Sequence, residues 1–357
     1  MRFYITGGAG FIGSELVRYL INTTTHQVLN VDALSYAGNL DSLESVKNSD
    51  RYTFHHLNIC DYKSLKESII NFKPDFIMHL AAESHVDRSI EHPDTFIHTN
   101  IIGTLNMLKA SYEYWNTLEG SSKSSFRFHH ISTDEVYGDL GRGSNNKFDE
   151  SSSYDPSSPY SASKASSDHL VRSWGRTFSL PTIITNCSNN YGPYQFPEKL
   201  IPNVILNAIK NNPINIYGDG LQIRDWLFVS DHVEALVQTA LNAQPGQTYN
   251  IGGNNEISNL EVVNKICLLL DKKCPLTSSD LSSYREFISF VKDRPGHDQR
   301  YAINSSKIFS EIGWAPKESF DTGLEKTVTW YLENTKWIER ILSGEYKLNR
   351  MGILQTK

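Results

Sequence analysis

Residues 6–13 read Thr6-Gly7-Gly8-Ala9-Gly10-Phe11-Ile12-Gly13 and follow a short apolar stretch at 2–6. This order predicts a strand, a glycine turn and then a helix. Gly7, Gly10 and Gly13 permit a tight turn and let a pyrophosphate approach the backbone at the helix N-terminus. A glycine pattern by itself is equally typical of an ordinary tight turn, and the residues downstream decide between the two.

The strand–helix order continues to about residue 190. Strands are expected at 27–31, 52–58, 75–80, 126–132 and 182–186, and helices at 11–22, 62–71, 99–114 and 159–178. Strands separated by helices form parallel sheets, so we expect an α/β fold with a doubly wound parallel sheet and ligands at the carboxyl ends of its strands.

Beyond residue 190, prolines and glycines interrupt this alternation. We therefore expect a dinucleotide-binding domain over 1–190, to which the chain later returns, and a smaller mixed α/β lobe over 191–346 that binds substrate. A tail follows at 347–357. Serine-rich stretches at 120–125, 151–158 and 277–283 are expected to be surface loops, and a last helix is expected near 320–334.

Composition excludes several classes of protein. The 357 residues are 39% hydrophobic and 21% charged, with a formal net charge of −6, which is typical of a globular chain with a core. An acidic chain without basic blocks is not expected to bind nucleic acid. No apolar run approaches the roughly 18 residues that span a bilayer. The four cysteines form no CxxC and no signal-peptide pattern opens the chain, so we expect a cytoplasmic protein with reduced thiols.

Asp32 ends the second expected strand, 19 residues after Gly13. A carboxylate there accepts hydrogen bonds from adenosine ribose hydroxyls and repels a 2′-phosphate, and Ala33-Leu34-Ser35 supplies no arginine. The sequence therefore predicts NAD rather than NADP. Residues 58–61 and 80–84, after the third and fourth strands, are expected to frame the cofactor, although alone they would equally be strand ends with helix caps.

Ser157-Ser158-Pro159-Tyr160-Ser161-Ala162-Ser163-Lys164 begins the helix expected at 159–178, with Ser158 as its N-cap. Tyr160 and Lys164 are four residues apart and share one helix face. A phenol, with a pKa of about 10, is a poor base at neutral pH. The ammonium of Lys164 and the positive nicotinamide of NAD⁺ are expected to lower the pKa of Tyr160. The alternative is a tyrosine–lysine pair that packs on a helix surface.

The strand expected at 126–132 runs into Thr133-Asp134-Glu135-Val136-Tyr137-Gly138. Acids at the carboxyl end of a parallel strand lie beside the cofactor, where one donates a proton and the other accepts one. Capping of the next turn is the alternative role for either acid.

These motifs resemble those of a known family. TGGAGFIG at 6–13, Asp32, YSASK at 160–164 and the overall length are similar to the extended short-chain dehydrogenases/reductases. The resemblance implies a Rossmann sheet, a tyrosine that removes a hydroxyl proton while hydride passes to nicotinamide, and a lysine that holds the ribose. STDEVYG at 132–138 resembles the signature of nucleotide-diphosphate-glucose 4,6-dehydratases. Related 4-epimerases lack the acid pair, and related decarboxylases and GDP-mannose dehydratases typically keep only the glutamate.

The resemblance extends from residue 2 to about residue 346. NNYGPYQFPEKLIP at 189–202, YGDG at 217–220 with RDW at 224–226, and DRPGHD at 293–298 are similar to the family's substrate segments. Taken alone, Arg224 and Arg294 would be ordinary surface cations, but here they are expected to hold a diphosphate. The resemblance also implies a homodimer joined through the helices near 99–114 and 159–178.

The motifs and the resemblance together imply three sets of site residues. The catalytic set is Thr133, Asp134, Glu135, Tyr160 and Lys164. The cofactor set is Gly7, Gly10, Phe11, Ile12, Gly13, Asp32, Asn58, Ile59, Leu80, Ala81, Ala82, Ser84, Thr99, Tyr160, Lys164 and Asn190. The substrate set is Ser84, Thr133, Asn189, Glu198, Lys199, Leu200, Asn215, Tyr217, Arg224, Asn259, Arg294 and His297.

The implied reaction converts dTDP-glucose to dTDP-4-keto-6-deoxyglucose by oxidation at C4, loss of water across C5–C6 and return of hydride to C6. Tyr160 would take the 4-hydroxyl proton, Thr133 would bond the 4-oxygen, Glu135 would remove the C5 proton and Asp134 would protonate the departing 6-hydroxyl. The alternatives are a UDP-glucose 4,6-dehydratase, another epimerase or dehydratase of this fold, and a non-catalytic NAD-sensing protein.

Two histidine pairs, at 55–56 and 129–130, lie in expected strands. Adjacent strand residues face opposite sides of a sheet, so neither pair is expected to chelate one ion, and no metal site is expected.

Overall fold

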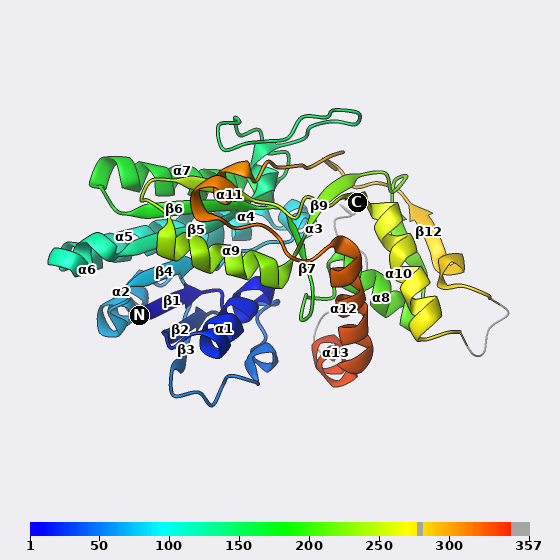
Figure 1. Cartoon of the computed structure of the whole chain (residues 1–357), viewed down its shortest axis with the longest axis horizontal. Helices are drawn as coiled ribbons and strands as arrows, with labels where there is room; N and C mark the ends of the chain where they lie inside the picture. Colours follow the sequence, from blue (N-terminus) through cyan, green and yellow to red (C-terminus); the bar gives the residue numbers. More distant parts are fainter. Residues whose placement is uncertain (277–280, 344–357) are drawn as a thin grey trace.

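A parallel sheet forms the larger part of the molecule in the computed structural model, which describes residues 1–276 and 281–343 (Figure 1). In spatial order its strands are β10 (Thr248–Ile251), β6 (Thr182–Cys187), β5 (Arg127–Thr133), β4 (Phe76–His79), β1 (Arg2–Thr6), β2 (Gln27–Asp32) and β3 (Tyr52–His56). Every neighbouring pair in this sheet is parallel. The expected α/β, doubly wound parallel sheet is thus confirmed.

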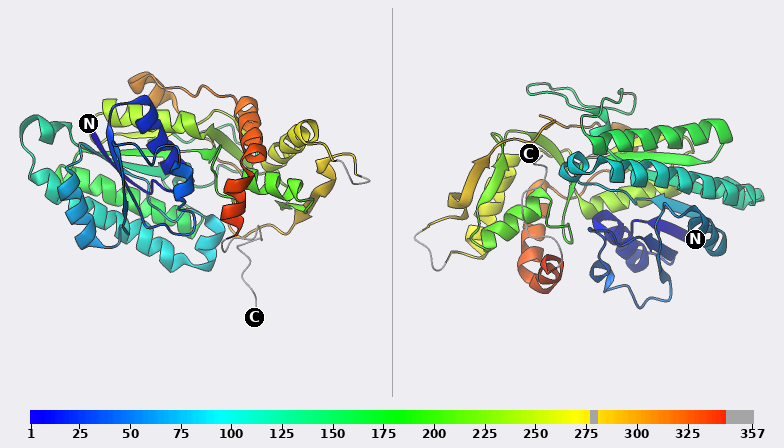
Figure 2. Two further views of the ribbon diagram at one scale, coloured as in Figure 1. Left: turned by 90° about the horizontal axis from the view of Figure 1, so that it is seen from below. Right: turned by 180° about the vertical axis from the view of Figure 1, so that it is seen from behind.

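Helices cover both faces of this sheet (Figures 1 and 2). They are α1 (Phe11–Thr23), α2 (Tyr62–Phe72), α3 (Val86–Glu91), α4 (Pro93–Phe96), α5 (Thr104–Asn116), α6 (Gly120–Ser125), α7 (Pro159–Phe178), α9 (Val229–Asn242) and α11 (Ser306–Ile312). Short 3₁₀ segments are η1 (Leu40–Leu43) and η3 (Asp134–Tyr137), and η2 (Ile97–Gly103) is π-helical.

The alternation of side chains along β1 explains the two layers of helices. Phe3 and Ile5 pack in a core with α1, α9 and α11, while Tyr4 packs in a second core with α2, α5 and α7. All three side chains are fully buried. A strand that is apolar on both faces requires cover on both sides, which is why β1 lies in the interior of the sheet.

A smaller lobe is built from later segments. It contains the three-stranded sheet β11 (Glu256–Ser258), β9 (Ile223–Phe228), β7 (Asn189–Tyr191) and the pair β12 (Ile288–Val291), β8 (Ile214–Tyr217). Its helical elements are α8 (Leu200–Ile209), α10 (Asn259–Lys273), η4 (Tyr284–Phe287), α12 (Phe320–Glu333) and α13 (Thr335–Leu342). A third hydrophobic core joins these helices to β7, β8 and β9.

The two lobes are interleaved along the chain. From residue 189 the chain builds β7, α8, β8 and β9, and returns to the large sheet with α9 and β10. It then crosses to the smaller lobe with β11, α10 and β12, adds α11 to the large sheet and ends in the smaller lobe with α12 and α13. α9 packs on α1 and β10 pairs with β6. The tail expected at 347–357 lies outside the described residues.

Three local expectations need correction. Gly120–Ser125 is a short exposed helix rather than a loop, anchored where the Trp115 indole donates to the carbonyl of Lys123 at 3.0 Å. The helix expected at 99–114 begins as the π-helical η2, where Gly103 approaches Ile59 so closely that a Cβ would lie 2.5 Å from its Cδ1. The sequence analysis expected the last helix near 320–334, but a further helix, α13, follows it. Of the serine-rich stretch at 277–283, residues 277–280 lie outside the described chain.

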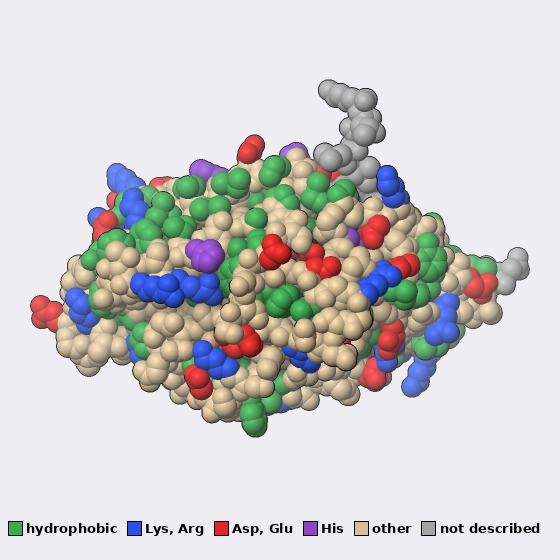
Figure 3. Space-filling view, turned by 90° about the horizontal axis from the view of Figure 1, so that it is seen from above, with side chains coloured by type: hydrophobic (Ala, Val, Ile, Leu, Met, Phe, Trp, Pro, Cys, Tyr) green, Lys and Arg blue, Asp and Glu red, His purple; other side chains and the backbone are tan. Residues whose placement is uncertain are grey.

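Figure 3 shows how charged side chains are distributed on one face of the molecule. On the face shown in Figure 3, basic and acidic side chains are interspersed and no continuous basic stripe crosses it. Among the described residues, no helix is long and apolar enough to cross a membrane.

The N-terminus of α7 supports the segment that carries Tyr160. Ser158 and Ser161 form a reciprocal capping box: the Ser161 backbone N–H donates to the Ser158 hydroxyl at 3.1 Å, and the Ser161 hydroxyl lies 3.0 Å from the Ser158 backbone N–H. Such a cap satisfies N–H groups that the first helical turn otherwise leaves without partners.

We predict that Ser158→Ala lowers the free energy of unfolding by about 1 kcal/mol, because the cap is lost. Urea titration followed by circular dichroism measures the change. Ser166→Ala, in the middle of the same helix, removes only a hydroxyl bonded to Ala162 and serves as the matched control. Equal stability of Ser158→Ala and the parent protein would contradict the capping role.

Candidate active site

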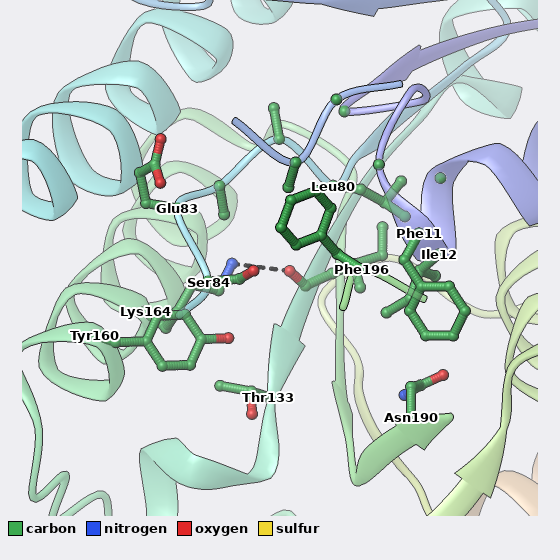
Figure 4. A pocket seen from close by; sticks show the side chains of 18 of the residues that line it. Phe11, Ile12, Leu80, Glu83, Ser84, Thr133, Tyr160, Lys164, Asn190 and Phe196 are labelled. Atoms are coloured by element: carbon green, nitrogen blue, oxygen red, sulfur yellow. Dashed lines mark hydrogen bonds between the residues drawn. The ribbon is translucent and has the colours of Figure 1, made fainter. Parts of the chain in front are cut away.

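A cavity of about 390 Å³ opens at the carboxyl ends of the parallel strands. The glycine loop, the end of β2, the segment after β4 and the N-terminal turns of α7 form its walls. Figure 4 shows Tyr160, Lys164 and Thr133 on one side of this cavity and Phe11 and Ile12 on the other. Every residue of the expected cofactor and catalytic sets lines it.

The glycine loop leaves no room for side chains at two positions. Gly7 has a φ of +75°, and a Cβ there would lie 2.7 Å from the Ala81 nitrogen. A Cβ on Gly13 would lie 2.1 Å from the Gly7 carbonyl oxygen. α1 begins beside Gly10 with no side-chain cap, so the N–H groups of its first turn are left for a ligand. This is the arrangement that a pyrophosphate requires.

Asp32 joins the end of β2 to the glycine loop. Its Oδ2 accepts a hydrogen bond from the Ala9 backbone N–H at 2.9 Å, and its Oδ1 accepts one from Leu34 at 2.8 Å. Burial raises the pKa of Asp32, and the two backbone bonds oppose that shift. Described lining residues beside Asp32 include Val31, Ala33 and Ser35 but no lysine or arginine, which favours NAD over a 2′-phosphorylated cofactor.

The adjacent acids lie where β5 passes into η3. Burial raises the pKa of Asp134 well above its ordinary value, and the charges of Glu135 and Asp225 raise it further. Burial also raises the pKa of Glu135, but here cations act in the opposite direction, namely Arg294, Lys199 and Arg224. Burial thus raises the pKa of both carboxyls, and the nearby cations make Glu135 the one that ionises more readily.

A backbone carbonyl of β5 holds the Lys164 side chain in place. Its Nζ donates to the Ile131 carbonyl at 2.9 Å, and burial lowers its pKa. Asp168, one helical turn later, is also buried; it accepts hydrogen bonds from Tyr154 and Asn186 and lies 3.2 Å from His130. Asn186 in turn donates to the Thr133 carbonyl at 3.1 Å. This network fixes the strand end that carries the acids.

A second cavity of about 230 Å³ adjoins the first, and Glu135, Asn189 and Glu198 line both. The Arg294 Nη1 donates to Asp87 Oδ1 at 2.9 Å, and its buried Nε has no hydrogen-bond partner among the described residues. Arg224 donates to the carbonyls of Ile223 and Asp298. Buried guanidinium groups at the end of a cavity suit an anionic ligand such as a diphosphate.

Comparisons with known proteins agree with this geometry. A family model described as GDP-mannose 4,6 dehydratase matches residues 4–327. The dTDP-glucose 4,6-dehydratase of Neisseria meningitidis serogroup B is 56% identical over 351 residues, which cover 98% of this chain and 99% of that protein. This chain belongs to the NAD-dependent nucleotide-sugar epimerase/dehydratase family.

Solved structures of this family have the same fold. The dTDP-glucose 4,6-dehydratase of Bacillus anthracis, in complex with NAD, is 40% identical with a TM-score of 0.84, and the match covers 96% of this chain and 99% of that one. The dTDP-glucose 4,6-dehydratase of Streptomyces venezuelae, with NAD and TYD bound, is 39% identical with a TM-score of 0.85, covering 96% and 100%.

The remaining residues expected to contact the substrate lie in these two cavities. Ser84 and Thr133 line the first, and the others line the second: Asn189, Glu198, Lys199, Leu200, Asn215, Tyr217, Arg224, Asn259, Arg294 and His297. The structure thus brings together side chains from both lobes of this dehydratase-family protein. Their individual contacts with a ligand stay predictions.

The chain's own groups act on Tyr160 against the expected effect of Lys164 and the nicotinamide. Burial and the negative charge of Glu135 raise the pKa of Tyr160 well above its ordinary value, although hydrogen bonding by Thr133 opposes the shift. The sequence pattern located the lysine, but it gave no measure of desolvation or of the nearby carboxylates. The expectation that NAD⁺ and Lys164 together lower this pKa stays a prediction.

Some lining residues were missed by the sequence analysis. Asp87 positions Arg294 and also accepts from the Tyr217 hydroxyl at 3.3 Å. The ring of Tyr301 lies beneath the Arg224 guanidinium, 4.4 Å from its carbon. Asp87 follows directly after the expected cofactor segment at 80–84, and Tyr301 follows the 293–298 motif, so proximity to these motifs was the available signal.

We predict that Asp134→Asn raises the free energy of unfolding at pH 7. A carboxyl whose pKa is raised on folding contributes its full stability below the ordinary pKa of about 4, and that stability is lost as the pH rises through the folded pKa. An amide does not titrate, so it avoids this loss. Urea titrations at pH 7 and near pH 4 should show an advantage for the variant that shrinks at the lower pH. An advantage of the same size at both pH values would contradict this account.

Proposed function

We propose that this protein converts dTDP-glucose into dTDP-4-keto-6-deoxyglucose, with Asp134 and Glu135 as the acid and base of the dehydration. The observation that carries the proposal is the unequal environment of these two adjacent carboxyls: Asp134 lies among other acids, and Glu135 faces three cations. Full-length relatives with more than half of their residues identical carry the name of this activity.

The cofactor site fits NAD, held by the glycine loop, Asp32 and Lys164. When bound, NAD⁺ supplies the acceptor for hydride from C4 of the sugar and its return at C6. Tyr160 takes the proton of the 4-hydroxyl, and Thr133 hydrogen-bonds the 4-oxygen. Because the chain raises the pKa of Tyr160, formation of its phenolate requires more positive charge nearby than Lys164 alone supplies.

The dehydration follows from the chemistry of the 4-ketone. The ketone acidifies the C5 proton, which the ionised Glu135 removes. Asp134 gives its proton to the departing 6-hydroxyl, so that water leaves across C5–C6. Return of a proton to C5 from Glu135 completes the product without net oxidation. Two of the cations that act on Glu135, Arg224 and Arg294, are also the groups proposed to hold the diphosphate.

Residues 1–190, together with the returning α9, β10 and α11, form the proposed cofactor domain, and the other described segments after 190 form the proposed substrate lobe.

We also propose a homodimer joined through η2, α5 and α7. Support comes from α5 and α7, which pack side by side, and from exposed apolar side chains on these elements, Ile97 at 50%, Ile102 at 39% and Phe178 at 40%. A cytoplasmic location is proposed because none of the four cysteines is in a disulfide.

Product mass spectrometry tests the substrate. The purified protein is incubated separately with dTDP-glucose, UDP-glucose and GDP-mannose, without added cofactor. Loss of one water from dTDP-glucose alone is the expected result. Loss only from UDP-glucose would keep the mechanism and change the nucleotide specificity, because the two substrates differ by the 2′-hydroxyl and by the 5-methyl group of the base, the methyl being worth about 1–3 kcal/mol of discrimination. Tight NAD binding with no loss from any of the three, even with NAD⁺ added, would favour the non-catalytic alternative.

We predict that Glu135→Gln separates the two half-reactions. The variant should retain the rise in absorbance at 340 nm on addition of substrate, but it should release dehydrated product roughly 10²–10⁴-fold more slowly, because general-base catalysis at C5 is lost. Tyr160→Phe, in contrast, should abolish the absorbance rise as well. Normal product release by Glu135→Gln would refute the role of Glu135.

A further inference from the structure

Tyr36 lies outside the cofactor cavity but between two of its walls. It is in the segment after β2, where its neighbours Ser35 and Ala37 line the cavity. The opposite wall includes Phe196 and Glu198, from the segment between β7 and α8. Tyr36 itself is not among the residues that line the cavity, so any effect on a bound cofactor must act through these neighbours.

Three contacts tie Tyr36 to the opposite wall and to α3. Its hydroxyl donates to Glu198 Oε1 at 3.0 Å. The Arg88 guanidinium carbon lies 3.7 Å above the centre of its ring, and Arg88 Nε donates to Glu198 Oε2 at 3.3 Å. The Phe196 ring meets the Tyr36 ring edge-on, with the ring centres 5.7 Å apart.

Glu198 is the shared acceptor of this cluster. Its side chain is 2% exposed. Oε1 accepts a hydrogen bond from Tyr36 and Oε2 accepts one from Arg88, and both bonds join the two lobes. A buried carboxylate retains its position only while such donors remain, because an unpaired buried charge is costly. Residues 36 and 198 are far apart in sequence and belong to the two sides of the cavity, so this bond must break before the walls separate.

We propose that Tyr36, with Arg88 and Glu198, forms a clasp that retains NAD in its cavity throughout the catalytic cycle. Tyr36 is a positioning residue, since it acts by holding the 33–38 segment against the 195–199 segment. The inference rests on the cofactor site and also on the proposed function, because a reaction that returns its hydride to the sugar fails whenever reduced cofactor leaves before the second transfer.

The far end of the same segment is also anchored. Where η1 follows it, the Trp337 indole Nε1 of α13 lies 3.3 Å from the Ser42 hydroxyl, and Arg340 Nε lies 3.1 Å from Asp41 Oδ2. The segment is thus held by α13 at one end and by the Asn39 backbone N–H, which donates to the Ala9 carbonyl at 2.9 Å, while the Tyr36 hydroxyl ties it to Glu198 on the opposite wall. The hydroxyl of Tyr36 is therefore the group to remove.

The experiment measures release of NAD from the holoenzyme without any sugar nucleotide. Protein loaded with radiolabelled NAD is mixed with excess unlabelled NAD, and the retained label is followed by rapid filtration. Tyr36→Phe keeps the ring under Arg88 and against Phe196 but loses the bond to Glu198. We expect about ten-fold faster release, the loss that follows from removing one hydrogen bond to a charged acceptor.

The chain offers a matched control. The Tyr62 hydroxyl donates to Glu113, and Lys109 Nζ lies 4.5 Å from the centre of the Tyr62 ring, so Tyr62→Phe removes the same kind of bond away from the cavity. Tyr62→Phe should release NAD at the parental rate. Arg88→Met, which removes the second donor to Glu198, should accelerate release as Tyr36→Phe does, and the double variant should show less than the product of the two effects because both share one acceptor.

Parental release rates in both Tyr36→Phe and Arg88→Met would overturn the clasp. Equal acceleration in Tyr36→Phe and Tyr62→Phe would also overturn it, since the effect would then be general loosening of the fold. Because no sugar is present, failure of the proposed dehydratase activity leaves these release rates fully interpretable.

Discussion

The parallel direction of the seven central strands is the constraint on which the site depends. Parallel strands place all their carboxyl ends on one edge, so residues that are far apart in sequence meet there. Asp32 follows from β2, Leu80 and Ala81 from β4, and Thr133 from β5. These residues meet because the connections between the strands return the chain to the opposite edge of the sheet, so that every strand runs toward the same edge.

Desolvation sets the chemistry at that edge. Asp134, Tyr160 and Lys164 are all buried, so each is pushed toward its neutral form. Burial raises the pKa of Glu135 as well, but three cations from the smaller lobe oppose that shift. In the proposed mechanism the larger lobe therefore supplies the proton donor, and charge from the smaller lobe helps the neighbouring carboxyl to act as a base. The difference between the surroundings of Asp134 and Glu135 therefore depends on contacts between the two lobes. The adjacent acids in the sequence do not by themselves predict it.

Sequence reasoning located local features well. It predicted the bounds of β1 and α7 as the structure has them, since each begins or ends at strong signals such as the glycine loop and the Ser158–Pro159 cap. The residues that it expected at the site line the two cavities. It did not foresee the π-helical η2, which depends on packing against Ile59, or the raised pKa of Tyr160, which depends on depth of burial. Contacts such as Tyr36 with Glu198 join residues 162 apart, and no local pattern reports such a pairing.

The interleaving of the two lobes has a consequence for how the chain folds during synthesis. The edge strand β10 ends at Ile251, so the large sheet remains open beside β6 until that residue has left the ribosome, and three strands of the other lobe, β7, β8 and β9, emerge before it does. The core of the smaller lobe in turn waits for Trp337 and Ile338 near the end of the described chain. The larger lobe is completed by α11, and the smaller lobe closes only when α12 and α13 follow. Apolar surface at the open edge thus stays uncovered until late in translation, which favours aggregation of the nascent chain.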